Sequence, residues 1–175
     1  GGEGEGRVQE GECEAQRLLG LASMRTQDLE KALVCLHKML DLSKELGDGA
    51  AEAAACSALA DAYQAVGDRA ESVRRVEAYL RAATSSGDVE GQRQACGRLG
   101  ALHRAAGDFT RAAEYLGKAY QLSRALGDAA AADQARLALG IALASAKREA
   151  LLGAIKGDLG ALLAWKNRRA PLAAT

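Results

Sequence analysis

The sequence predicts an all-α protein built as a right-handed superhelical stack of antiparallel helix pairs. Three observations lead to this fold class. Ala and Leu dominate the 175 residues, whereas aromatic residues make up 3% and Pro occurs once, a composition that favours helix over strand. The dipeptide Gly-Asp returns every 20 residues, and residues 40 positions apart resemble each other in size and polarity. Such a fixed period is the signature of a stacked repeat.

Five Gly-Asp pairs divide most of the chain into segments of equal length. Their glycines are Gly47, Gly67, Gly87, Gly107 and Gly127. Gly adopts the left-handed conformation that ends a helix, and the carboxylate of the following Asp can cap the next one. Twenty residues hold a helix of about four turns and a short connection. We therefore expect each pair to separate two helices, with two helices in every 40-residue repeat.

Equivalent positions of successive repeats form columns. A leucine column consists of Leu19, Leu59, Leu99 and Leu139, and the next column, which is always small, consists of Gly20, Ala60, Gly100 and Gly140. In the second helix of each repeat, the small residues Ala32, Ser72 and Ala112 precede the apolar residues Leu36, Val76 and Leu116. Large residues beside small ones indicate closely packed helices. Each pair then leaves an apolar side that the next pair covers.

Two segments resemble the tetratricopeptide repeat. In a first helix the chain reads Leu59-Ala60-Asp61-Ala62-Tyr63, and across a turn it reads Gly107-Asp108-Phe109-Thr110-Arg111-Ala112. The ordinary repeat has 34 residues. The longer period found here is similar to that of Partner-of-Inscuteable-type scaffolds, and the Pro that usually ends the second helix is missing. The resemblance implies a solenoid that binds other proteins.

The period also predicts how the chain is organised. We expect a flexible Gly/Glu-rich segment at 1–8 and an array of three full repeats plus a fourth first helix at 9–148. A capping helix and tail should occupy 149–175, and the chain reads as part of a longer protein. Lys147-Arg148 replaces the expected Gly-Asp, so the helix from about residue 129 should run on. The spacing of the apolar residues Leu159, Leu162, Leu163 and Trp165 suits a helix laid over the open end of the array.

Composition argues against several function classes. Lys plus Arg equals Asp plus Glu, 23 each, so no positive excess favours nucleic acid or an anionic membrane. The only histidines are His37 and His103, which gives no metal-ligand spacing and no catalytic set. We expect no enzyme activity, cofactor, metal or small-molecule substrate. Cys56 and Cys96 share one column and should be buried, reduced thiols.

The resemblance to tetratricopeptide repeats also places a candidate partner-binding surface on the concave face, which first helices line. Projecting the family's groove positions onto this chain selects Arg17, Met24, Asp61, Gln64, Gln94, Arg104 and Gln134. An ordinary solvated face is the alternative interpretation of these polar residues. Chaperone-binding relatives carry a carboxylate clamp of Lys and Asn in these columns. Here Asp61 stands where Asn would, and its charge would repel a C-terminal carboxylate.

The C-terminal part resembles the end of tetratricopeptide-repeat proteins of cilia and flagella. Residues 140–144 are followed by 158–168, and the ending Leu-Leu-x-Trp-Lys-x-x-Arg contains Trp165, Lys166 and Arg168. This resemblance implies an axonemal scaffold in the cytoskeleton of a cilium or flagellum, tied to dynein arms and motility. The period alone favours a cytoplasmic adaptor of the Partner-of-Inscuteable type, which binds peptides in signalling or polarity complexes. Trp165 either packs on the last repeat or anchors a partner.

Overall fold

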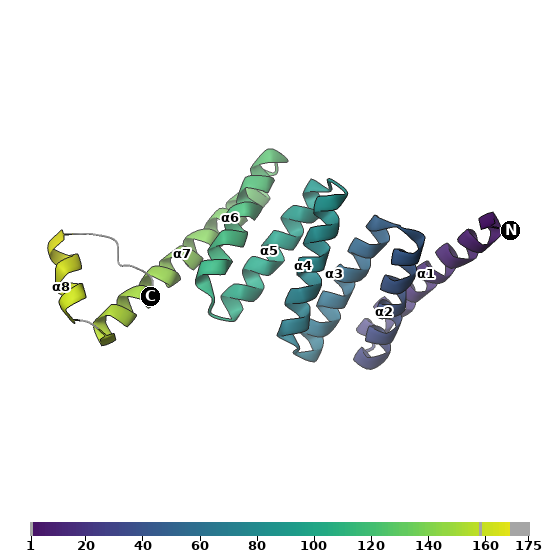
Figure 1. Cartoon of the computed structure of the whole chain (residues 1–175), viewed down its shortest axis with the longest axis horizontal. Coiled ribbons are helices and arrows are strands. Elements are labelled where there is room, and N and C mark those ends of the chain that lie inside the picture. Colours follow the sequence, from purple (N-terminus) through teal and green to yellow (C-terminus); the bar gives the residue numbers. More distant parts are fainter. Residues whose placement is uncertain (1, 158, 169–175) are drawn as a thin grey trace.

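The computed structural model describes residues 2–157 and 159–168, whose regular structure is entirely helical. The helices are α1 (Gly2–Arg25), α2 (Leu29–Leu46), α3 (Gly49–Val66), α4 (Arg69–Ser85), α5 (Val89–Ala105), α6 (Phe109–Ala125), α7 (Ala129–Gly157) and α8 (Leu159–Arg168). Figure 1 shows α1 to α7 side by side in chain order, which gives an elongated stack of antiparallel pairs. The expected all-α solenoid is confirmed. None of the described helices is both long and apolar enough to cross a bilayer.

The Gly-Asp turns are confirmed at all five positions. Each glycine has a positive φ, between +65° and +91°. Each aspartate then caps the next helix. For example, an Asp48 carboxylate oxygen accepts hydrogen bonds from the backbone N–H groups of Ala50 and Ala51, both at 3.0 Å. The same residues therefore end one helix in the left-handed conformation and satisfy free N–H groups of the next.

A sixth turn of the same kind joins α1 to α2, although it lacks glycine. Gln27 stands 20 residues before Gly47 and has a φ of +62°. Asp28 follows it and accepts a hydrogen bond from the backbone N–H of Lys31 at 3.2 Å. A side chain in the left-handed region is strained. The period therefore extends further towards the N-terminus than the Gly-Asp pairs indicated.

The small column packs closely wherever a second helix is present. A Cβ atom at Gly20 would lie 2.7 Å from a methyl carbon of Leu36, and one at Gly100 would lie 2.6 Å from Cγ of Leu116. Ala60 is fully buried. Gly140 departs from this pattern, because it is exposed and a Cβ there would have no neighbour within 4 Å. The expected close packing is therefore wrong for Gly140, which lies on a side of α7 that no helix covers.

The hydrophobic core follows the leucine column through the middle of the stack. Leu59 and Leu99 are completely buried, together with Leu36 and Val76 of the second helices. Leu19 occupies the same column in α1 but is 47% exposed, because no described helix lies on its outer side. A smaller cluster of Ala112, Leu116 and Ala142 joins α6 to α7. Burial therefore depends on having a neighbour on both sides.

The N-terminal segment differs from the expected flexible linker. Residues 2–8 form the first turns of α1. Gly lowers helix stability but does not forbid a helix, and the glutamates Glu3 and Glu5 interact favourably with the positive end of the helix dipole. The segment also continues directly into a strong helix. Composition alone misassigned these residues.

The C-terminal boundary at 148 also differs, since it falls inside a helix. The run-on at Lys147-Arg148 is confirmed, because α7 continues without a break to Gly157. The segment 149–157 is therefore part of α7. The helix α8 contacts α7 but leaves Gly140 exposed, so it does not cap the array as expected. Figure 1 shows α8 beyond the far end of α7, and the predicted tail at 169–175 lies outside the described residues.

Candidate partner-binding groove

The largest described cavity lies along the first helices of the first two repeats. It is open and has a volume of about 670 Å³. Its lining includes Arg17 and Leu21 of α1, Ala54, Ser57 and Asp61 of α3, and Tyr79 of α4. Small residues predominate in the α3 part of this surface, because Ala50, Ala53 and Ala58 also line it. They make a shallow trough with charged side chains at its edge.

A second cavity continues the same face towards the C-terminus. Its volume is about 380 Å³, and it lies between α5 and α7. Gln94, Gly97 and Arg98 line it from α5, whereas Gln134 and Ala138 line it from α7. Leu116 and Ala119 of α6 also line it. The first helices of the repeats therefore form a groove in two sections.

Arg98 connects these two sections. Its guanidinium donates a hydrogen bond to the hydroxyl of Ser57 at 2.8 Å and forms an ion pair with Asp61. This arrangement joins α5 to α3 and neutralises the carboxylate that the sequence placed on the concave face. Sequence reasoning missed Arg98. The available signal was its charge, opposite to that of Asp61, in the neighbouring repeat.

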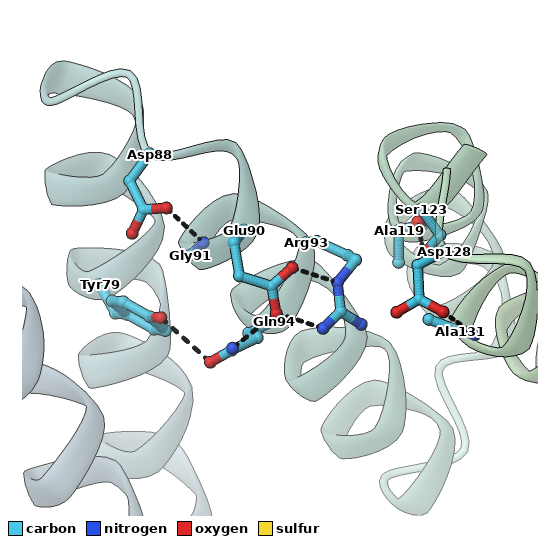
Figure 2. Close-up of polar contacts among 10 residues, drawn as sticks. All are labelled: Tyr79, Asp88, Glu90, Gly91, Arg93, Gln94, Ala119, Ser123, Asp128 and Ala131. Carbon is cyan, nitrogen blue, oxygen red and sulfur yellow. Dashed lines mark hydrogen bonds and ion pairs between the residues drawn. The ribbon is translucent and has the colours of Figure 1, made fainter. Parts of the chain in front are cut away.

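A polar chain holds Gln94 in place at the junction of α4 and α5 (Figure 2). The hydroxyl of Tyr79 donates to the amide oxygen of Gln94 at 3.4 Å, and the Gln94 amide nitrogen donates to Glu90 at 2.8 Å. Arg93 binds the same carboxylate. The hydrogen bonds from Arg93 and Gln94 lower the pKa of Glu90 to about 2. The carboxylate therefore stays ionised at neutral pH and orients Gln94 at the groove edge.

Four of the seven predicted groove residues line the two cavities. Arg17 and Asp61 lie in the first cavity, and Gln94 and Gln134 lie in the second. Arg17 is also paired within its own helix, since it donates two hydrogen bonds of 2.7 Å to Glu14. The charged groups Arg17 and Asp61 therefore have partners within this chain.

The other three predicted residues lie elsewhere. Gln64 and Arg104 are exposed but line neither cavity. Met24 is half-buried and packs against the main hydrophobic core. Its flexible apolar side chain gains more by filling core space than by facing solvent. The prediction that Met24 belongs to the binding face is therefore wrong.

Two apolar residues of α7 were missed on this face. Leu137 is 69% exposed and Ile141 is 46% exposed. They stand one period after Gly97 and Ala101, in the columns that contain Arg17 and Leu21. The column arithmetic that selected Arg17 would have found them, had it been applied to apolar residues too. The concave columns thus change from polar to apolar towards the C-terminus.

The titratable groups that chemistry would require are used in packing. His103 is 8% exposed and stacks on Tyr115 with ring centroids 5.5 Å apart. Cys56 and Cys96 are buried as expected, and burial raises the pKa of both thiols. Within residues 2–157 and 159–168, no cluster of His, Cys, Asp or Glu side chains has the arrangement of a metal site. The described geometry is therefore that of a binding surface.

The C-terminal signature is only partly described. Lys166 is exposed on α8, whereas the side chains of Trp165 and Arg168 lie outside the part of the chain that the structure describes. The choice between packing and partner binding for Trp165 therefore stays a prediction.

Comparisons with known proteins agree with the period and the fold. The tetratricopeptide repeat family model matches residues 55–90 and 95–130. Tetratricopeptide repeat protein 29 from Macaca fascicularis and from Homo sapiens is 25% identical to this chain over 169 residues, which cover 94% of the chain. The same alignment covers 36% of each relative, so the chain spans about a third of their length. The solved tetratricopeptide domain of Arabidopsis FLU superposes with a TM-score of 0.62 at 22% identity, covering 69% of this chain and 99% of that domain.

Proposed function

Because this chain is built from tetratricopeptide repeats, we propose that it is a protein-interaction scaffold that binds a partner segment along the groove of its first helices. The cavity of about 670 Å³ between α1 and α3 is the observation that carries this proposal. The charges at its edge already have partners, since Arg17 is paired with Glu14 and Asp61 with Arg98. What is left for a ligand is a trough of alanines.

The chemistry of this trough favours a partner helix or extended peptide with apolar side chains. Such a segment would bury Ala50, Ala53, Ala54 and Ala58, while its polar atoms met the groove edge. Towards the C-terminus, Leu137 and Ile141 offer further apolar area. A peptide recognised through its terminal carboxylate fits poorly, because the groove has no lysine–asparagine clamp among its lining residues.

The groove proposal is tested by blocking the trough with a large charged side chain. Ala54→Arg places a guanidinium in the first cavity, whereas Ala70→Arg places one on the exposed surface of α4 as a matched control. Crosslinking mass spectrometry with each tagged variant should lose groove-bound partners for Ala54→Arg and keep them for Ala70→Arg. Equal recovery of the same partners by both variants would contradict binding in this groove.

For cellular role, we propose an axonemal scaffold of a cilium or flagellum, associated with dynein arms and with motility. The proposal is supported by the resemblance of 140–144 and 158–168 to ciliary tetratricopeptide proteins. The 25% identity to tetratricopeptide repeat protein 29 supports it over most of the chain. This identity is modest, so location needs a direct measurement.

Fractionation of isolated cilia tests this role. The tagged protein should remain with detergent-extracted axonemes, and in-situ crosslinks should connect it to dynein-associated proteins. The alternative is a cytoplasmic adaptor of the Partner-of-Inscuteable type, which the 40-residue interval between equivalent Gly-Asp turns favours. Recovery only in the cytoplasmic fraction, with crosslinks to polarity or signalling complexes, would support the adaptor and exclude the axonemal role.

A further inference from the structure

One side of α7 lacks the helix that covers the equivalent side of the earlier first helices. Gly100 and His103 of α5 are buried against α6. The equivalent residues of α7 are Gly140, which is exposed, and Leu143, which is 46% exposed. The opposite side of α7 is packed, because Ala142 is buried against α6. We call the uncovered side, formed by Gly140 and Leu143, the α7 socket.

The chain itself shows three times what fills such a socket. Helices α2, α4 and α6 lie against the small residues of α1, α3 and α5. Each carries a small residue followed four positions later by a branched aliphatic residue, namely Ala32 and Leu36, Ser72 and Val76, and Ala112 and Leu116. In α2 and α6 the aliphatic side chain occupies the space above the glycine. The occupant of the fourth socket should have the same pattern.

The residues of the α7 socket are unfavourable for a surface that stays in water. Glycine in the middle of an exposed helix destabilises it relative to alanine. In α1 and α5 this loss is offset by the close approach of Leu36 and Leu116. Gly140 gains no such contact, because a Cβ there meets nothing within 4 Å. An occupant that packs against Gly140 and buries Leu143 would supply the missing compensation.

No described segment of this chain reaches the socket. The helix α7 passes the expected turn and continues to Gly157, and α8 has only 10 residues. At about 1.5 Å per residue, Gly140 lies roughly 26 Å before the end of α7, whereas α8 is roughly 15 Å long. The occupant must therefore come from outside 2–168.

We propose that the α7 socket is a docking site for an amphipathic helix of another protein, which completes the fourth helix pair. This helix carries Ala or Ser followed four residues later by Leu or Val and runs antiparallel to α7. A second copy of the chain is a poor occupant, because its own helices of this pattern are already used. Leu36 and Val76 are completely buried, and Leu116 is 5% exposed. The site is separate from the trough between α1 and α3.

The probe is a labelled peptide with the sequence of α6, residues 109–125, tested for binding to the full chain by fluorescence anisotropy. We expect saturable binding with one peptide per chain. Gly140→Leu should weaken it at least about tenfold, because the added side chain fills the space meant for the peptide leucine. Gly117→Leu is the matched control, since a Cβ at Gly117 also meets nothing within 4 Å but α6 carries it away from the socket.

Several results would overturn the proposal. It fails if the peptide does not bind, if a peptide with Asp in place of Leu116 binds equally well, or if Gly140→Leu binds as tightly as Gly117→Leu. Dimerisation of the chain that Gly140→Leu abolishes would instead identify a second copy as the occupant. Circular dichroism checks that both variants remain folded. The groove variant Ala54→Arg should bind the peptide normally, which separates failure of this site from failure of the groove.

Discussion

The helices α5 and α7 occupy equivalent positions in successive repeats and meet different surroundings. In α5, Leu99 is completely buried and Gly100 lies against Leu116. In α7, Leu139 is half-buried and Gly140 is exposed. The two helices carry the same Leu-Gly pair at these positions. The difference teaches that in a repeat array a residue's energetic role is set by the helix that lies beside it.

The largest expected effect comes from the leucine column. Leu99→Ala should reduce the free energy of unfolding by about 2–5 kcal/mol, because it leaves a cavity in the buried core. Leu19→Ala, at the open N-terminal end, should reduce it by only about 1 kcal/mol, since Leu19 is already 47% exposed. Urea denaturation followed by circular dichroism measures both. Equal losses would mean that the two ends of the column are packed alike.

The small column should give the next effect. Gly100→Leu should reduce the free energy of unfolding by about 3 kcal/mol, because a Cβ already lies 2.6 Å from Cγ of Leu116. Gly140→Leu should leave it unchanged or raise it by about 1 kcal/mol, since helix propensity improves and nothing is displaced. Thermal unfolding of the two variants compares them directly. A variant of Gly100 that melts at the wild-type temperature would contradict the column assignment.

The turns provide a smaller test of the same idea. Gln27→Gly should raise the free energy of unfolding by about 1 kcal/mol, because glycine relieves the left-handed strain at φ +62°. Gly67→Ala, at φ +91° in an interior turn, should lower it by about 1–2 kcal/mol. Chemical denaturation of both variants measures the difference. Stabilisation by Gly67→Ala would show that this turn does not need the left-handed conformation.

The smallest effect concerns two glutamate–arginine pairs. The pKa of Glu90 is lowered to about 2 by hydrogen bonds from Arg93 and Gln94, whereas the pKa of Glu14 is lowered by Arg17 without such a second donor. A lowered folded pKa stabilises the protein above the unfolded value, and this stabilisation disappears as pH falls from about 4.5 towards 2. Because Glu90 is half-exposed, the change in stability should be only a few tenths of a kcal/mol. NMR titration should show Glu90 protonating at lower pH than Glu14 and shifting upwards in Gln94→Ala.

The sequence was most informative where local chemistry repeats. Glycine at positive φ and aspartate at the helix start act within a few residues, so the turns and helix pairs were predictable from the 20-residue spacing. Gln27 was missed because the search required glycine. The segment 2–8 was assigned from composition, although its continuity with α1 decides its conformation. The length of α7 followed correctly from the replacement of Gly-Asp by Lys147-Arg148.

The groove was predictable only in part. Column arithmetic found Arg17, Asp61, Gln94 and Gln134 but could not tell that Met24 turns to the core. It also could not give the ion pair between Arg98 and Asp61, because cross-helix pairing depends on how far neighbouring repeats rotate. Leu137 and Ile141 were overlooked since polar residues were sought. The uncovered side of Gly140 required the structure, because the sequence does not show where α8 lies.

The uninterrupted length of α7 has a mechanical consequence. Its 29 residues form a rod of roughly 44 Å, and the last ten or so project roughly 15 Å past the position where an earlier repeat would have turned. This projection carries α8, with exposed Lys166, away from the groove. A molecule held at α8 and another held in the groove would not obstruct each other. The rod therefore acts as a spacer that lets a single chain bring two different proteins within a fixed reach.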